Sequence, residues 1–246
     1  MKEQKITNEN EKNKLIIFDL DGTLYKLKGG SFANSKLYKK ILQNAVEYIQ
    51  KNLNISRREA QKTLIKIKNK HGENISVALE SEFGLDRYNY FKEVWNIDPE
   101  KYIEKYANLE DVLTKLSKEY KFILMSDAPK VWIENVLKEL NVKDFFEDNI
   151  LSGEGKKRKI YGNRFDGLLS KNNLDPKNVL VVGDQENTDI IPANKFGFKT
   201  IYINRKWNSQ YADINLKDIN DLESAITFLF SNINGNKKAK KTGGFF

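Results

Sequence analysis

The chain has 246 residues, enough for one large domain or for one domain that carries a smaller inserted one. Apolar residues make up 39% of the sequence and aromatic residues 11%, which suffices for a packed core and excludes wholesale disorder. The chain has no cysteine and a single histidine, so disulfide frameworks, thiolate metal sites, cysteine nucleophiles and histidine triads are excluded.

The net charge of +8 is concentrated toward the C-terminus. Residues 232–246 contain four lysines and no acidic residue, so removing them leaves +4 (8 − 4) for the rest of the chain. This basic tail and residues 1–13 are predicted to be flexible termini. We expect the tail to aid solubility, and nucleic acid is not an expected partner. With no secretory signal and no apolar run near the ~20 residues of a membrane span, a cytoplasmic protein without membrane contact is expected.

Three short apolar runs lead into acidic residues, and each run is predicted to be a fully buried strand. The runs and the residues that follow them are 15–18 with Asp19, 121–125 with Ser126 and Asp127, and 178–182 with Gly183 and Asp184. Residues 149–152 and 199–204 are two further β-rich runs.

Amphipathic helical stretches separate these strands, at residues 109–119, 130–140 and 188–196. The last of them stops at Gly197, a suitable C-terminal cap. Alternating buried strands and amphipathic helices predict an α/β fold with a doubly wound, Rossmann-like parallel sheet. Ligands of such sheets bind beyond the carboxyl ends of the strands, so the acidic strand endings are expected to gather there.

Residues 26–108 have almost no strand signal and are predicted to form an inserted all-helical cap domain. The helical stretches are 35–53, a second helix that starts at the capping box Ser56–Glu59, and shorter pieces at 77–83 and 87–95. The aromatic residues Tyr88, Tyr90 and Trp95 have a spacing that favours packing in the core of this insertion. The catalytic core is accordingly predicted to comprise residues 14–25 and 109–231.

Asp19 and Asp21 lie two residues apart on a loop after a buried strand, where they can divide the work of phosphoryl transfer. Asp19 can attack phosphorus to form an aspartyl-phosphate. Asp21 is placed to protonate the leaving oxygen and then to deprotonate the attacking water. Gly22 permits the tight turn, in which backbone N–H groups can hold phosphate oxygens. An ordinary acidic loop has the same spacing, but the preceding strand favours the phosphoryl site.

The later strand endings supply the remaining groups of such a site. The Ser126 hydroxyl and the N–H of Asp127 could bind a phosphoryl oxygen, although Pro129 also makes this a helix start. The basic cluster at residues 156–159 could neutralise charge on the transferred group. Asp184 and Asp189 offer the hard oxygen ligands that suit Mg²⁺, although Asp184 could instead cap the following helix.

These motifs, in this order, resemble those of the haloacid dehalogenase-like hydrolases. The four motifs of that family are matched by residues 18–24, residues 123–127, Lys159, and residues 182–189. The resemblance runs from about residue 14 to residue 230. One departure is that the proline usual after the motif lysine is absent at Ile160, so Lys156 and Lys157 stay competitors of Lys159; Phe165 does match.

The resemblance implies a role for each matching residue. Asp19 would be the nucleophile and a metal ligand, and Asp21 the general acid and base, with its backbone carbonyl on the metal. Ser126 would bind phosphate, and Lys159 would bridge nucleophile and phosphate. Asp184 would complete a magnesium site that Asp189 supports.

The function expected from these residues is magnesium-dependent hydrolysis of a small phosphomonoester such as a nucleotide, a sugar phosphate or a phosphoglycolate-like compound. Three alternatives stay open: a phosphomutase of the same fold, a non-catalytic phosphate-binding module, and a nucleic-acid end phosphatase that uses the basic tail. Asp21 argues against the dehalogenase branch, which needs neither that acid nor the metal. The substrate and the oligomeric state cannot be deduced from the sequence.

Overall fold

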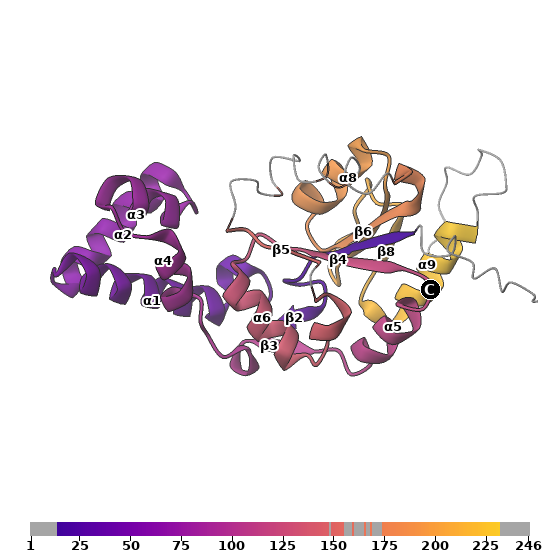
Figure 1. Cartoon of the computed structure of the whole chain (residues 1–246), viewed down its shortest axis with the longest axis horizontal. Coiled ribbons are helices and arrows are strands. Elements are labelled where there is room, and N and C mark those ends of the chain that lie inside the picture. Colours follow the sequence, from indigo (N-terminus) through magenta and orange to yellow (C-terminus); the bar gives the residue numbers. More distant parts are fainter. Residues whose placement is uncertain are drawn as a thin grey trace, which may run out of the picture.

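The computed structural model describes residues 14–147, 149–154, 159, 165, 168 and 174–231. The chain forms a six-stranded sheet with helices on both faces, and a group of four helices, α1 to α4, lies to one side of the sheet (Figure 1). Both predicted flexible termini and the competing lysines Lys156 and Lys157 lie outside the described residues. Among the described residues, no helix is both long enough and apolar enough to cross a membrane.

All paired strands of the large sheet run parallel, in the order β5-β4-β1-β6-β7-β8. The strands are β1 (Leu15–Phe18), β4 (Lys121–Met125), β5 (Ile150–Leu151), β6 (Val179–Gly183), β7 (Lys199–Ile203) and β8 (Ile214–Leu216). The chain builds outward from β1 through β4 to β5, and then returns to the other side of β1 with β6. The direction of winding therefore reverses between β1 and β6, which is where a doubly wound sheet opens a crevice for a ligand. The predicted fold class is confirmed.

Both faces of the sheet are buried, which explains why its strands are continuous apolar runs. Ile16 and Phe18 of β1 belong to one core, with the helices α5 (Leu109–Leu116), α6 (Lys130–Glu139) and α9 (Leu222–Ser231). Leu15 and Ile17 face the opposite core, with α8 (Ile191–Lys195). Figure 1 shows α8 on one side of the sheet and α5 and α6 on the other.

The apolar faces of the four helices pack against one another, and their buried residues are continuous with the core that contains Ile16 and Phe18. The four helices are α1 (Lys36–Leu53), α2 (Arg57–His71), α3 (Ile75–Phe83) and α4 (Arg87–Val94). The predicted capping box is confirmed, because the Ser56 side chain accepts from the Glu59 backbone while the Glu59 side chain accepts from the Ser56 backbone. Tyr90 is buried as expected, but Tyr88 is 58% exposed, so the prediction of a core position is wrong for Tyr88.

Two short antiparallel strands, β2 (Tyr25–Leu27) and β3 (Ile103–Lys105), flank the helical group in the sequence. Their pairing brings the two chain connections to the helices side by side. The segment that follows α4 also contacts α6: the Asn135 amide of α6 donates to Asn96 Oδ1 at 3.1 Å and to the Ile97 carbonyl at 3.3 Å. These strands were not expected from the sequence, and the cap boundaries at residues 26 and 108 stay a prediction.

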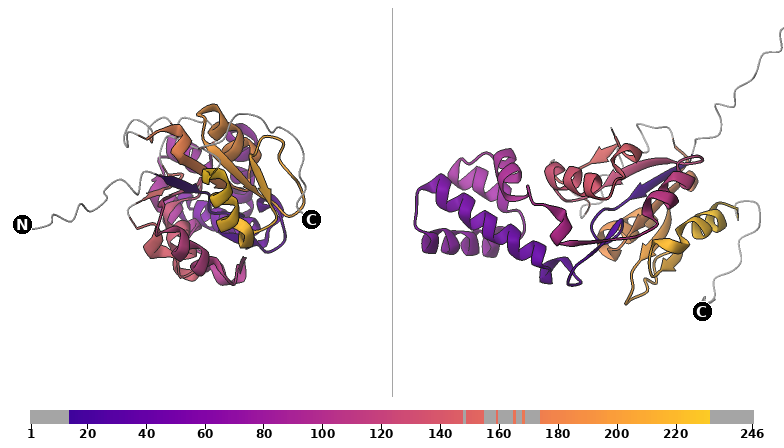
Figure 2. Two further views of the ribbon diagram at one scale, coloured as in Figure 1. Left: turned by 90° about the vertical axis from the view of Figure 1, so that its right-hand side faces the viewer. Right: turned by 90° about the horizontal axis from the view of Figure 1, so that it is seen from below.

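Short helical turns complete the described chain, at Phe32–Asn34, Pro99–Lys101, Lys143–Phe145, Pro176–Asn178 and Ile219–Asp221. The helix predicted over 188–196 is divided: one turn of π-helix, Glu186–Ile190, precedes the α-helix α8. Pro192 at the start of α8 fits this division, since proline lacks the N–H that an interior helical position needs. Figure 2, right, shows the helical group and the sheet with its helices as two separate masses.

Candidate active site

Asp19 is the first residue after β1 and is only 4% exposed. Its backbone N–H donates to the Val182 carbonyl at 2.9 Å, which extends the β1–β6 pairing by one residue. Its Oδ1 atom accepts from Lys159 Nζ at 2.5 Å, and its Oδ2 atom accepts from the Thr23 hydroxyl at 3.2 Å. The sheet therefore fixes the backbone of Asp19 at the crevice, and two donors fix its carboxylate.

Lys159 is also 4% exposed, and its ammonium group pairs with Asp19 and, at 2.8 Å, with Asp189 Oδ1. Burial alone would lower the pKa of Lys159, but the carboxylates of Asp189 and Asp19 raise it above its usual value, so the lysine is charged. Its backbone N–H donates to Asp127 Oδ1 at 3.0 Å. The side chain of Asp127 thus holds the backbone of Lys159, a contact that the sequence did not predict.

Asp21 points its carboxyl group at three side-chain donors. Oδ1 accepts from the Tyr25 hydroxyl and, at 2.9 Å, from Nε1 of Trp132, while Oδ2 accepts from Ser126 Oγ at 3.3 Å. Burial raises the pKa of Asp21, the charge on Asp19 raises it further, and the bonds from Tyr25 and Trp132 partly offset this. A carboxyl group with a raised pKa is suited to carry a transferable proton.

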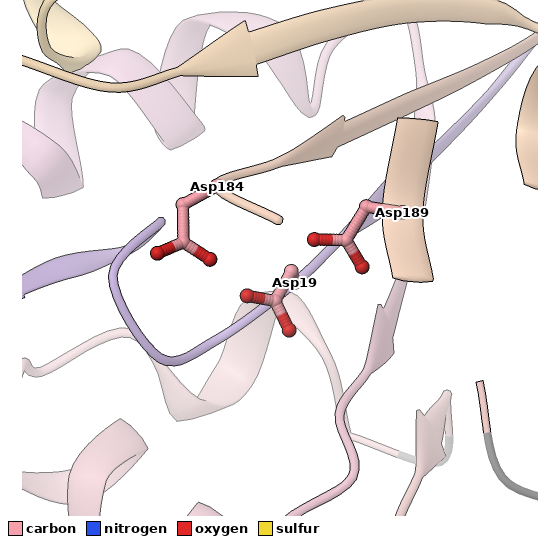
Figure 3. Close-up of side chains that lie close together, drawn as sticks. All are labelled: Asp19, Asp184 and Asp189. Carbon is pink, nitrogen blue, oxygen red and sulfur yellow. The ribbon is translucent and has the colours of Figure 1, made fainter. Parts of the chain in front are cut away.

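Asp184 and Asp189 approach Asp19 from β6 and from the π-helical turn that follows it (Figure 3). Asp184 does not cap that turn, because the residue at the cap position is Gln185. Its Oδ1 atom is buried and has no hydrogen-bond partner within the described part of the chain. Burial, followed by the charges on Asp19 and Asp189, raises the pKa of Asp184 well above its usual range.

Asp189 uses both oxygens: Oδ1 accepts from Lys159 and Oδ2 accepts from the Gln185 N–H at 3.1 Å. Burial raises its pKa to about 6, against the opposing effect of Lys159. Asp189 therefore fixes the lysine and the turn, whereas Asp184 keeps a buried oxygen that has no partner among the described residues.

Two glycines leave room for the carboxylates of Asp184 and Asp189. A Cβ atom on Gly22 would lie 2.1 Å from Asp184 Oδ2, and the φ of Gly22 is +95°, which side-chain-bearing residues rarely adopt. A Cβ atom on Gly183 would lie 2.3 Å from Asp189 Oδ2. Any larger residue at either position would displace an aspartate of the site.

The acidic cluster fits a divalent cation. Asp19, Asp184 and Asp189 each offer a carboxylate oxygen, and these atoms lie within 4.8 Å of one another. Hard oxygen donors are the ligands that Mg²⁺ takes in proteins. The unpartnered, buried Oδ1 of Asp184 is the observation that best supports a cation there, because a buried polar atom without a partner is costly.

The predicted site residues that the structure describes lie together at this crevice, and they are Asp19, Asp21, Gly22, Ser126, Asp127, Lys159, Asp184 and Asp189. Ser126 follows β4, donates to Asp21, and accepts from the Ala128 N–H at 3.0 Å. Tyr25 and Trp132 were missed by sequence reasoning. In the sequence, Trp132 lies on the apolar face of the helix predicted over 130–140. That position indicates a buried side chain but does not predict the hydrogen bond from Trp132 to Asp21.

Residues 16–203 match the family described as haloacid dehalogenase-like hydrolase, and the chain belongs to this family. It is 26% identical over 222 residues to a glyceraldehyde 3-phosphate phosphatase of Pyrococcus furiosus, covering 83% of this chain and 85% of that protein. A glyceraldehyde 3-phosphate phosphatase of Methanothermobacter thermautotrophicus is 26% identical over 204 residues, covering 78% of this chain and 85% of that protein.

Among solved structures, a HAD phosphatase from Thermococcus onnurineus has a similar fold, with a TM-score of 0.61 and 19% identity. The match covers 87% of this chain and 97% of that one. The family assignment confirms the predicted resemblance. The predicted enzyme class, a phosphoric monoester hydrolase, agrees with the phosphatase names of these proteins.

Proposed function

We propose that the chain is a magnesium-dependent phosphatase that hydrolyses a small phosphomonoester through an aspartyl-phosphate on Asp19. The observation that carries this proposal is the pairing of buried Asp19 with buried Lys159 at 2.5 Å, beside the unpartnered oxygen of Asp184. A carboxylate that lies beside fixed positive charge can receive an anionic phosphoryl group, since the cation offsets the repulsion between nucleophile and substrate.

The reaction would proceed in two displacements. A carboxylate oxygen of Asp19 attacks phosphorus, the bond from phosphorus to the leaving oxygen breaks, and Asp21 gives its proton to that oxygen. Water then attacks the phosphorus of the aspartyl-phosphate and gives a proton to Asp21. The bond from phosphorus to the Asp19 oxygen breaks, so phosphate is released and Asp19 is restored. Each proton taken from Asp21 in the first step is returned in the second, so the enzyme is unchanged after a cycle.

The other residues would bind and orient the phosphoryl group. Ser126 and the backbone N–H groups at Gly22 and Asp127 would donate to its oxygens. Lys159 would hold the nucleophile in place and offset the charge that develops during transfer. Asp19, Asp184 and the backbone carbonyl of Asp21 would hold Mg²⁺, with Asp189 supporting them. When bound, this ion supplies electrostatic stabilisation of the transferring group.

The helices α1 to α4 would act as the cap that closes over the crevice and selects the substrate. A triose phosphate is the first candidate, because both curated relatives carry glyceraldehyde 3-phosphate in their names. The cytoplasmic location stays a prediction.

The test is phosphate release from a panel of glyceraldehyde 3-phosphate, phosphoglycolate, sugar phosphates and nucleotides, each with and without magnesium. We expect magnesium-dependent turnover of at least one small ester, and no turnover by the Asp19→Asn variant, whose amide is a poor nucleophile. An Asp19→Asn variant that keeps full activity would overturn the proposal. So would a folded wild-type enzyme that is inert toward the whole panel.

A further inference from the structure

The carboxyl group of Asp21 is held unequally at its two oxygens. Oδ1 accepts from two donors, the Tyr25 hydroxyl on β2 and Trp132 Nε1 on α6. Oδ2 accepts a longer bond, 3.3 Å, from the Ser126 hydroxyl. Trp132 Nε1 can only donate, so with two donors on Oδ1 that oxygen is held as an acceptor. The Ser126 hydroxyl can rotate to accept as well as donate, so a proton on the carboxyl group belongs on Oδ2.

Both donors are fixed by burial. Tyr25 and Trp132 are each 0% exposed, and they are among the largest fully buried side chains of the described residues. Trp132 is anchored by its helix, since the neighbouring residues Ile133, Val136 and Leu137 of α6 pack in the same core. A buried indole N–H or phenol O–H that lost its acceptor would carry the cost of an unsatisfied polar group. The two aromatic side chains therefore have one stable arrangement, with their donors on Asp21.

Neither aromatic residue has a part in the reaction as described above. We propose that Tyr25 and Trp132 are positioning residues, which hold Oδ1 of Asp21 so that Oδ2 gives its proton to the leaving oxygen of the substrate. The inference rests on the proposed function, because a general acid matters only if an ester bond is cleaved. In that step the phosphorus–oxygen bond breaks, and the electron pair left on oxygen takes the proton from Oδ2.

Leaving groups of different basicity separate this role from a merely structural one. A nitrophenolate leaves readily without a proton, whereas an alkoxide needs one, so a misplaced acid slows the release of alcohols selectively. The value of kcat/KM is the right readout, since it includes the step in which the leaving group departs and excludes the later hydrolysis of the aspartyl-phosphate.

The experiment compares wild type with Tyr25→Phe and Trp132→Phe on nitrophenyl, phenyl and alkyl phosphates in saturating magnesium. Since general acid catalysis contributes about 10²- to 10⁴-fold, partial misplacement should cost roughly 10- to 100-fold in kcat/KM on the alkyl ester. On the nitrophenyl ester the loss should be about 3-fold or less. Tyr25→Phe removes one hydroxyl and keeps the ring, so it stays informative if Trp132→Phe is poorly folded.

Tyr120→Phe is the matched control. Tyr120 is also a buried tyrosine, but it precedes β4 at the amino end of the sheet, against Phe230 and away from the strand endings that carry the site. Its kcat/KM values should keep the wild-type dependence on the leaving group.

A combination with Asp21→Asn provides the second measurement. If Tyr25 acts through Asp21, adding Tyr25→Phe to Asp21→Asn should cause no further loss on the alkyl ester. Equal losses on all three esters, or independent losses in the double variant, would overturn the inference while leaving the phosphatase proposal intact. A wild-type enzyme that hydrolyses none of the esters would instead remove the basis of both.

Discussion

Replacing Lys159 by methionine should destabilise the fold, because it leaves two buried carboxylates without their cation. The ammonium group lies 2.5 Å from Asp19 and 2.8 Å from Asp189, and all three side chains are at most 4% exposed. Removing one partner of a buried ion pair costs about 3–5 kcal/mol. For a chain of this size each kcal/mol lowers Tm by about 2–4 °C, so a fall of roughly 6–20 °C is expected.

The assay is thermal unfolding followed by circular dichroism in EDTA at about pH 7. Lys105→Met is the matched control, because Lys105 pairs with Glu139 at 2.6 Å but is 51% exposed. A solvent-exposed pair contributes about 1 kcal/mol or less, so this variant should lose only a few degrees. At about pH 5 the deficit of Lys159→Met should shrink, since Asp189, which has then lost the lysine that lowers its pKa, takes up a proton. Equal melting temperatures for the two variants would refute the reasoning.

Four further predictions concern the same crevice. Gly22→Ala should cost about 1–3 kcal/mol through its positive φ and, by displacing Asp184, should weaken magnesium activation of turnover; an unchanged magnesium requirement would contradict this. Without metal, stability should fall as pH rises from the usual 3.8 of Asp189 to its value of about 6, because the folded state binds more protons in that window. Bound magnesium offsets the repulsion among the ionised carboxylates of the cluster, which is greater at about pH 7 than at about pH 5. It should therefore raise Tm more at about pH 7, and an equal rise at both would count against the cluster as its site. Beryllium fluoride with magnesium should raise Tm further by mimicking a phosphoryl group on Asp19, and Asp19→Asn should abolish that additional rise.

The parts of the site that the sequence predicted are those set by strand endings. Asp19 and Asp184 each follow an apolar run, and parallel strands deliver such endings to one edge regardless of side-chain detail. The alternation of strands and helices predicts that the strands run parallel. It does not predict their order, which only the structure gives. Gly22 was predictable as a turn residue, but its role in admitting the Asp184 carboxylate depends on a contact between the segments that follow β1 and β6.

The parts that could not be predicted depend on tertiary packing. Trp132 contacts Asp21 across 111 residues, and only the rotation of α6 against the sheet determines which of its apolar residues reaches the site. The strands β2, β3 and β8 have three residues each, too few for a periodic pattern to emerge. Tyr88 and Tyr90 are both tyrosines, two positions apart in one helix, so residue type alone could not show that Tyr88 is exposed and Tyr90 buried.

The most direct test of the account is to trap the covalent intermediate. The enzyme, with magnesium and a small phosphate ester that it hydrolyses, is quenched in acid during turnover and treated with borohydride, which reduces an aspartyl-phosphate to homoserine. Peptide mass spectrometry then locates the modified residue. The account predicts homoserine at position 19, dependent on substrate. Modification at another residue, or turnover with position 19 always unmodified, would contradict the assignment of Asp19 as the nucleophile.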